Sequence, residues 1–136
     1  MNDLLTKFCL AIQHFEGYYP PDEQYPYGTA SYRNCNPGNL KYSQYTESLG
    51  AIAKSPAGFA IFSNYEDGFA ALCQFVSDAA HNELKAYQNC TIDSFFFIYA
   101  PPADNNPTNT YAQYVAAYVG LPLDTPISSL GKVENS

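Results

Sequence analysis

Positive charge is scarce in this 136-residue sequence. Six Lys and Arg residues stand against 13 Asp and Glu residues, which gives a formal net charge of -7. A nucleic-acid backbone requires a basic protein face that neutralises its phosphates, and an anionic membrane surface requires the same. The composition therefore excludes nucleic acid as a partner and disfavours adhesion to anionic lipid.

Long hydrophobic runs are also lacking. No apolar run approaches the roughly 20 residues that a membrane-spanning helix needs. The first residues, MNDLLTKFCLAIQHFEGYY, have neither the continuous apolar stretch nor the small-residue cleavage site of a secretory signal. We therefore expect a protein that is synthesised in the cytoplasm and is not embedded in a membrane.

The cysteine and histidine spacings contain no metal-binding pattern. Cys9, Cys35, Cys73 and Cys90 form no Cys-x-x-Cys pair, so we expect no metal and no cofactor. Two disulfides and four buried thiols both remain open. Cys9 and His14 are five residues apart, which places them on different faces of a helix and disfavours a Cys-based amidase or peptidase.

Charged residues make up only 14% of the chain, whereas tyrosine is abundant. There are 13 Tyr, nine Phe and no Trp, and 46% of the residues are hydrophobic. This composition predicts one folded domain over residues 1–136. Its surface polarity would come from hydroxyls and amides, which suit uncharged, hydroxyl-rich ligands such as glycans, although the tyrosines also suit a half-buried core.

Hydrophobic periodicity predicts a mainly helical α+β domain. Apolar residues recur at three- and four-residue spacing over residues 4–15, 65–79, 91–99 and 111–118, and Thr-Pro opens a further turn over 125–130. Two short extended segments, 40–42 and 59–62, are expected to pair as a small hairpin. The prediction is a helical bundle with a small β-hairpin insert.

Glu16 is the strongest candidate for chemistry. It falls in the last turn of the first expected helix, where the helix dipole favours a protonated carboxyl group. Phe15, Tyr18 and Tyr19 surround it with apolar surface, which would raise its pKa further. A protonated carboxyl group is what cleavage of a glycosidic bond requires. A solvated helix-end glutamate is the alternative interpretation.

Five segments in order resemble one known family. They are HFEGYY, SYRNCNPGNLKYS, GFAIFSNYEDGFAAL, YAPPADNNPTNTYAQYV and GLPLDTPISSL. Together they are similar to phage and prophage proteins with the lysozyme-like fold, which are related to lytic transglycosylases and goose-type lysozymes. The resemblance covers about residues 4–130 and implies a single lysozyme-like domain.

The resemblance also implies a function and a site. Glu16 would be the general acid and base that cleaves the bond between N-acetylmuramic acid and N-acetylglucosamine in peptidoglycan, with the protein acting at the cell wall as a monomer. Amide and phenol side chains would bind the glycan: Tyr32, Asn34, Asn36, Asn39, Tyr99, Asn105, Asn106 and Tyr111. Arg33 would brace the Asn-rich block through backbone carbonyls or a carboxylate.

Two features depart from the family pattern. Cys35 stands where the family usually has Asn, and no second carboxylate is set by spacing; the candidates are Asp22, Glu23, Glu47, Asp67 and Asp104. Lytic transglycosylases need no second carboxylate, so hydrolysis and transglycosylation both remain open. A non-catalytic virion or wall-binding protein and a chitin-type endoglycosidase are the alternatives.

The tyrosines divide into two predicted groups. Tyr65, Tyr114 and Tyr118 lie on apolar helical stripes and are expected to pack in the core. The candidates for the glycan groove flank Glu16 and the Asn-rich segments: Tyr18, Tyr19, Tyr32, Tyr99 and Tyr111.

Overall fold

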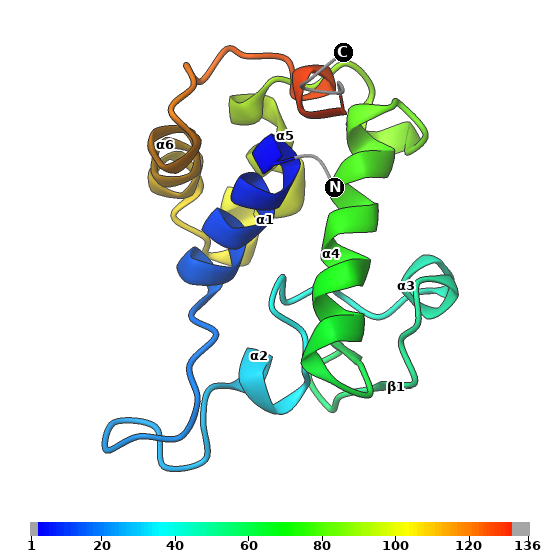
Figure 1. The fold of residues 1–136 in the computed structure, drawn as a ribbon, viewed down its shortest axis with the longest axis vertical. Helices are drawn as coiled ribbons and strands as arrows, with labels where there is room; N and C mark the ends of the chain where they lie inside the picture. Colours follow the sequence, from blue (N-terminus) through cyan, green and yellow to red (C-terminus); the bar gives the residue numbers. More distant parts are fainter. Residues whose placement is uncertain (1–2, 132–136) are drawn as a thin grey trace. The chain divides into compact units, whose positions relative to one another are not determined.

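The computed structural model describes residues 3–131, which are mainly helical (Figure 1). These residues contain six α-helices and one small antiparallel sheet, so the predicted α+β class is confirmed. The α-helices are α1 (Asp3–Glu16), α2 (Ala30–Arg33), α3 (Gln44–Ser48), α4 (Tyr65–Ala80), α5 (Ile92–Tyr99) and α6 (Thr108–Val119). The strands are β1 (Ala53–Lys54) and β2 (Ala60–Ile61), and the 3₁₀ turns are η1 (Lys85–Tyr87), η2 (Pro102–Asp104) and η3 (Ile127–Gly131).

The chain forms two compact units. The central unit is Ile12–Gln74, and the terminal unit combines residues 3–11 with residues 75–131. Helices α1 and α4 each begin in one unit and end in the other. The end of α1, which carries Glu16, belongs to the central unit.

Aromatic rings form the core of the terminal unit. Phe8 on α1 packs against Phe95 and Phe96 on α5, with ring centroids 5.6 and 5.8 Å apart. Phe96 stacks on Tyr111 of α6 at 4.6 Å. Phe8, Phe95 and Phe96 are fully buried, and burying such rings stabilises a fold by about 2 kcal/mol each.

The local signals at helix ends are confirmed. Gly17 follows α1 with φ +74°, and Gly120 follows α6 with the same value. Thr91 caps α5 by accepting a hydrogen bond from the Ser94 amide, and the Ser94 side chain accepts one in return. These residues end or begin helices because they satisfy backbone groups that the helix leaves unpaired.

The expected pairing of the segments 40–42 and 59–62 is confirmed as a single antiparallel bridge between Lys41 and Phe59, but the regular strand partner, β1, was not predicted. β2 lies within the predicted segment 59–62, but it pairs with β1, in the register Ala53 to Ile61 and Lys54 to Ala60. The segment 40–42 contributes only a single bridge, between Lys41 and Phe59. β1 is two residues long and exposed, so it lacks the alternating pattern by which a strand is recognised.

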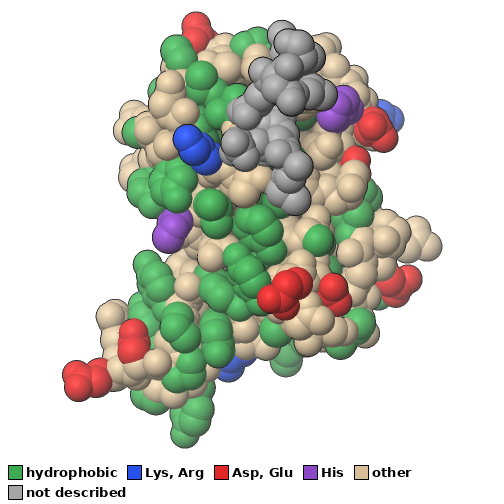
Figure 2. All heavy atoms as spheres, in the orientation of Figure 1, with side chains coloured by type: hydrophobic (Ala, Val, Ile, Leu, Met, Phe, Trp, Pro, Cys, Tyr) green, Lys and Arg blue, Asp and Glu red, His purple; other side chains and the backbone are tan. Residues whose placement is uncertain are grey.

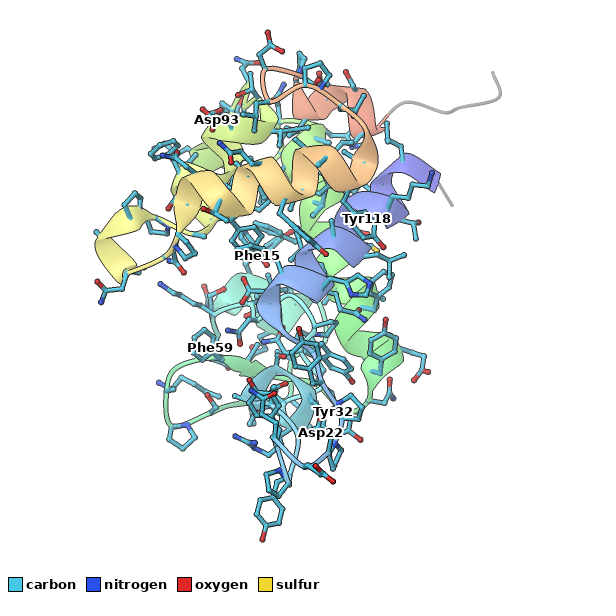
Figure 3. All side chains as sticks on the ribbon, turned by 90° about the vertical axis from the view of Figure 1, so that its left-hand side faces the viewer. Phe15, Asp22, Tyr32, Phe59, Asp93 and Tyr118 are labelled. Atoms are coloured by element: carbon cyan, nitrogen blue, oxygen red, sulfur yellow. The ribbon has the colours of Figure 1, made fainter. Side chains whose placement is uncertain are left out.

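The tyrosines of α6 are placed opposite to the prediction. Tyr111, expected at the glycan, is 1% exposed, whereas Tyr114 and Tyr118, expected in the core, are 39% and 40% exposed. Figure 3 labels Tyr118 on this helix. The buried stripe runs instead through Tyr111, Ala112 and Val115, and both faces of the helix carry tyrosine, so residue type alone does not distinguish them.

Few cations appear on the molecular face in Figure 2, where uncharged polar and hydrophobic side chains predominate. Among residues 3–131, no helix is long and apolar enough to cross a bilayer. All four cysteines are thiols rather than disulfides; Cys9, Cys73 and Cys90 are buried and Cys35 is half-buried.

Candidate functional site

The predicted site residues are distributed over both units. Five lie in the central unit: Glu16, Tyr32, Asn34, Asn36 and Asn39. Four lie in the terminal unit: Tyr99, Asn105, Asn106 and Tyr111.

Glu16 is the last residue of α1 and is half-buried. The chain leaves the helix through a Schellman motif, in which the Gly17 amide donates to the His14 carbonyl and the Tyr18 amide donates to the Gln13 carbonyl. The left-handed φ of Gly17 makes this exit possible without a Cβ penalty. The sequence motif Glu-Gly-Tyr thus places Glu16 at the negative end of a helix.

The Asn-rich block is tied to this helix end. The hydroxyl of Ser31, which is 3% exposed, donates to the Gly17 carbonyl at 3.4 Å. Tyr19 and Thr29 are joined by two bonds: the Tyr19 amide donates to Thr29 Oγ1 at 3.1 Å, and the Thr29 amide donates to the Tyr19 carbonyl at 3.0 Å. Two segments that are separate in sequence therefore meet beside Glu16.

Tyr18 lies between two other phenol rings. Its ring centroid is 5.4 Å from that of Tyr32 and 5.3 Å from that of Tyr65 at the start of α4. The Tyr65 hydroxyl donates to Gln13 Oε1 at 2.8 Å, one turn before Glu16. This bond joins α4 to the last turn of α1, which restricts where the Glu16 backbone can lie.

Burial also changes the acidity of this cluster. The pKa of Tyr18 is raised to about 12, chiefly by desolvation on burial and to a smaller extent by electrostatic repulsion of the phenolate by the nearby Cys35, Tyr32, Tyr65 and Glu66. The raised value means that the folded protein holds the phenol proton more tightly than the unfolded chain does.

We expect Tyr18 to ionise late in an alkaline titration. Because its folded pKa lies above the unfolded value of about 10, its contribution to stability is complete below pH 10 and is lost as the pH rises toward 12. In a spectrophotometric titration of the phenolates, Tyr18→Phe should lack part of the absorbance change that the wild type shows near pH 12. Loss of the change near pH 10 instead would show that Tyr18 is not desolvated.

Asn36 requires a correction, because it is fully buried rather than on the glycan surface. Its Nδ2 donates to the carbonyls of Leu40 and Ala60, both at 2.9 Å, and its Oδ1 accepts from the Leu40 amide at 2.9 Å. With 0% exposure and every amide group bonded, Asn36 fastens the Asn-Pro-Gly-Asn turn to the segment that contains β2. Its role is structural.

Two residues of the same block have left-handed backbones. Cys35 and Asn39 both have φ +52°, a conformation that Asn adopts far more readily than other residues with a side chain. Within residues 3–131, the buried Oδ1 of Asn39 has no hydrogen-bond partner. An Asn at position 35 would therefore suit this backbone conformation whatever its side chain contacts.

This backbone conformation predicts that Cys35→Asn stabilises the protein. Relief of the left-handed strain should raise the free energy of unfolding by about 0.5 to 1 kcal/mol, as measured by denaturant unfolding. Cys35→Ala is the matched control, since it removes the thiol without adding a residue that tolerates this conformation. Equal stability of the two variants would contradict this prediction.

Gly68 on α4 packs directly against this turn. A Cβ at Gly68 would lie 1.8 Å from the Cys35 carbonyl oxygen and 3.0 Å from Pro37 Cδ. On the outer side of the block, Arg33 Nη1 donates to the Gly28 carbonyl at 2.5 Å, which confirms the expectation that Arg33 braces a backbone carbonyl. The third motif segment thus joins the first two within the central unit.

The four predicted residues of the terminal unit have different environments. Tyr99 is half-buried within the aromatic core, and Tyr111 is buried there, so Tyr111 is corrected from a glycan contact to a core residue. Asn105 is exposed with φ +61°, and the Asn106 side chain donates to the Pro101 carbonyl at 3.1 Å. Asn106 therefore holds the turn that separates α5 from α6.

Several residues that shape the site were not predicted. The hydrogen bond between Tyr65 and Gln13 joins residues that are 52 positions apart in the sequence. No local sequence pattern predicts a contact over such a separation. Gly68 had a usable signal, because an isolated glycine inside a helical pattern indicates close packing. Tyr27 also had a sequence signal, because it lies between Pro26 and Gly28, two residue types that are typical of turns.

The described residues contain no cluster of three or more His, Cys, Asp or Glu side chains that would hold a metal ion. A comparison with protein-family models, curated proteins and solved structures found no match for this chain.

Proposed function

We propose that this protein is a peptidoglycan-cleaving glycosidase with a lysozyme-like fold, in which Glu16 is the general acid and base. The observation that carries the proposal is the convergence of three motif segments at Glu16. The helix end, the Asn-rich block and the start of α4 are joined by the Ser31 to Gly17 bond and by the Tyr18 contacts with Tyr32 and Tyr65. A reactive carboxyl group needs a fixed position of this kind.

The placement of Glu16 suits acid catalysis. Glu16 is half-buried at the helix C-terminus, where partial negative charge disfavours the ionised form of a carboxyl group. Glu16 would protonate the oxygen that bridges N-acetylmuramic acid and N-acetylglucosamine, through an oxocarbenium-like transition state. It would then accept a proton from the muramyl 6-hydroxyl, which gives a 1,6-anhydro end, or from water.

The other candidate carboxylates favour the anhydro product. Asp22 Oδ1 accepts the Tyr25 amide at 2.7 Å, and Glu47 accepts the Tyr42 hydroxyl at 2.6 Å. Asp67 lies in the first turn of α4, where the helix dipole stabilises its charge. Three of the five candidates thus have structural roles, while Glu23 and Asp104 are exposed; this favours a mechanism that needs one carboxylate over one that needs two.

A non-catalytic wall-binding or virion protein of the same fold is the second candidate. The observation in its favour is that Asn36 and Tyr111, both expected at the glycan, are buried. Loss of two contacts would weaken substrate positioning while leaving a surface that still binds the wall.

The products released from purified peptidoglycan distinguish these candidates. The wild-type protein is expected to release muropeptides with 1,6-anhydro ends, identified by mass spectrometry. New reducing ends would establish hydrolysis instead, and absence of any released fragment would favour the non-catalytic protein. Chitin oligomers in a parallel digestion test the chitin-type alternative.

A further inference from the structure

The segment that connects α1 to α2, residues 19–29, is a loop with fixed ends. Its ends are joined by the two hydrogen bonds between Tyr19 and Thr29. Inside it, the Asp22 amide donates to the Tyr25 carbonyl at 2.9 Å, the Tyr25 amide donates to Asp22 Oδ1, and the Gly28 amide donates to the Tyr25 carbonyl at 2.9 Å. Figure 1 shows that this loop projects beyond α2. We call it the tyrosine loop.

The tyrosine loop holds aromatic rings in solvent. Tyr27 is 80% exposed and Tyr19 is 44% exposed. Three prolines, Pro20, Pro21 and Pro26, restrict the backbone around these rings. Exposed rings on a restrained loop bind a flat ligand with little loss of conformational entropy, because the protein has already lost that freedom on folding.

The rings of this loop lead toward Glu16. Tyr25 and Tyr19 are stacked with centroids 6.0 Å apart and planes 29° apart. The Tyr19 ring lies over Gly17, so that a Cβ at Gly17 would be 3.4 Å from Tyr19 Cε2. Gly17 follows Glu16 directly in the chain. The stacked rings of Tyr19 and Tyr25 therefore lie beside the residue that follows the proposed acid, and Tyr27 comes two residues after Tyr25 in the same loop.

The chemistry of the loop selects the class of ligand. Its exposed charged residues are Asp22 and Glu23, which repel phosphates and other anions. It contains no Leu, Ile, Val or Met, so it offers little to an acyl chain. Phenol rings provide an apolar face for the C–H side of a sugar ring and a hydroxyl for its polar edge. Uncharged hydroxyl-rich rings fit this surface best.

We propose that the tyrosine loop is a glycan-binding platform, on which Tyr19 and Tyr27 stack against sugar rings of the strand whose scissile bond reaches Glu16. This inference rests on the proposed function for the identity of the strand. The platform supplies binding that is equal in the ground state and the transition state, because it lies outside the reacting sugar.

The test measures binding and cleavage separately. Co-sedimentation with insoluble purified peptidoglycan gives the dissociation constant, and release of soluble fragments gives kcat and KM. Tyr27→Ala is expected to raise the dissociation constant and KM about tenfold, as for loss of one well-placed aromatic contact, while kcat changes less than about twofold. Tyr27→Phe keeps the ring and should retain most of the affinity.

Tyr118→Ala is the matched control, because Tyr118 is also an exposed tyrosine but lies on α6. It should leave wall binding unchanged, and thermal unfolding should show that Tyr27→Ala is as stable as the wild type. Equal binding by Tyr27→Ala and wild type, or absence of wild-type binding to the wall, would overturn the platform. Tyr27-dependent binding without any cleavage would support the platform and overturn the proposed enzymatic function instead.

Discussion

Glu16→Gln is expected to lower the rate of peptidoglycan cleavage about 10³-fold, the usual contribution of a positioned general acid. Glutamine has nearly the same shape as glutamate but has no proton to give to the leaving oxygen. The half-buried position at the end of α1 should accept it, since a neutral amide suits the negative end of a helix. The loss should therefore appear in kcat, with wall binding retained.

Glu83→Gln is the control for this variant. It makes the same chemical change at an exposed residue after α4, in the terminal unit. Its cleavage rate should be within about twofold of wild type, as is typical of surface substitutions away from a site. If both variants lose activity equally, the loss arises from the change in net charge and its effect on wall binding. Glu16 would then not be the general acid.

Gly68→Ala is expected to destabilise the protein by about 3 kcal/mol, at the upper end of what overpacking costs. The added Cβ would lie 1.8 Å from the Cys35 carbonyl oxygen. That oxygen belongs to the backbone of a tight turn, so it cannot move aside as a flexible side chain would. Denaturant unfolding followed by circular dichroism would measure the change.

The sign of this effect separates packing from helix propensity. Alanine is favoured over glycine in a helix interior by about 1 kcal/mol, so propensity alone predicts that Gly68→Ala stabilises α4. The control is Ala70→Gly, at an exposed position two residues later, which should destabilise by roughly that amount. A stable Gly68→Ala variant would mean that α4 does not lie against the Cys35 turn.

The positions of α1, α4, α5 and α6 could be predicted from the sequence because their signals are local, whereas the short helices α2 and α3 were not predicted. Gly17, Thr91 and Gly120 act on backbone groups within a few residues of themselves, and each ends or begins a helix where its chemistry requires. The apolar spacing of α4 and α5 needs no knowledge of the partner helices either.

The errors concern contacts with distant segments. The two faces of α6 both present tyrosine, so only the packing of Phe96 against Tyr111 determines which face is inside. β2 pairs with β1 because of the turn between them, whereas its own sequence is equally compatible with the segment 40–42. Such choices depend on tertiary structure rather than on propensity.

In the candidate site, too, local features could be predicted from the sequence and contacts with distant segments could not. The position of Glu16 at a helix end follows from the Glu-Gly-Tyr motif, and the tight turn follows from Asn-Pro-Gly-Asn. The burial of Asn36 does not follow, because the Ala60 carbonyl that it binds lies 24 residues away. An asparagine that binds sugar and one that fastens a turn have the same side chain, and only the fold distinguishes them.

The abundant tyrosines therefore serve two purposes in this account. Tyr111 is part of the aromatic core of the terminal unit, while Tyr18 and Tyr65 hold the end of α1 in the central unit. Tyr19 and Tyr27 remain exposed on a restrained loop that begins beside Glu16. A chain with few charges can thus present a polar surface suited to glycans.

The most direct test of the central claim is a paired digestion of one batch of purified peptidoglycan by the wild-type protein and by Glu16→Gln, with new glycan ends counted by mass spectrometry. If Glu16 is the general acid, the wild type cleaves abundantly between N-acetylmuramic acid and N-acetylglucosamine, and the folded variant cleaves about 10³-fold less. Equal numbers of new ends from the two proteins, or none from the wild type, would contradict the claim.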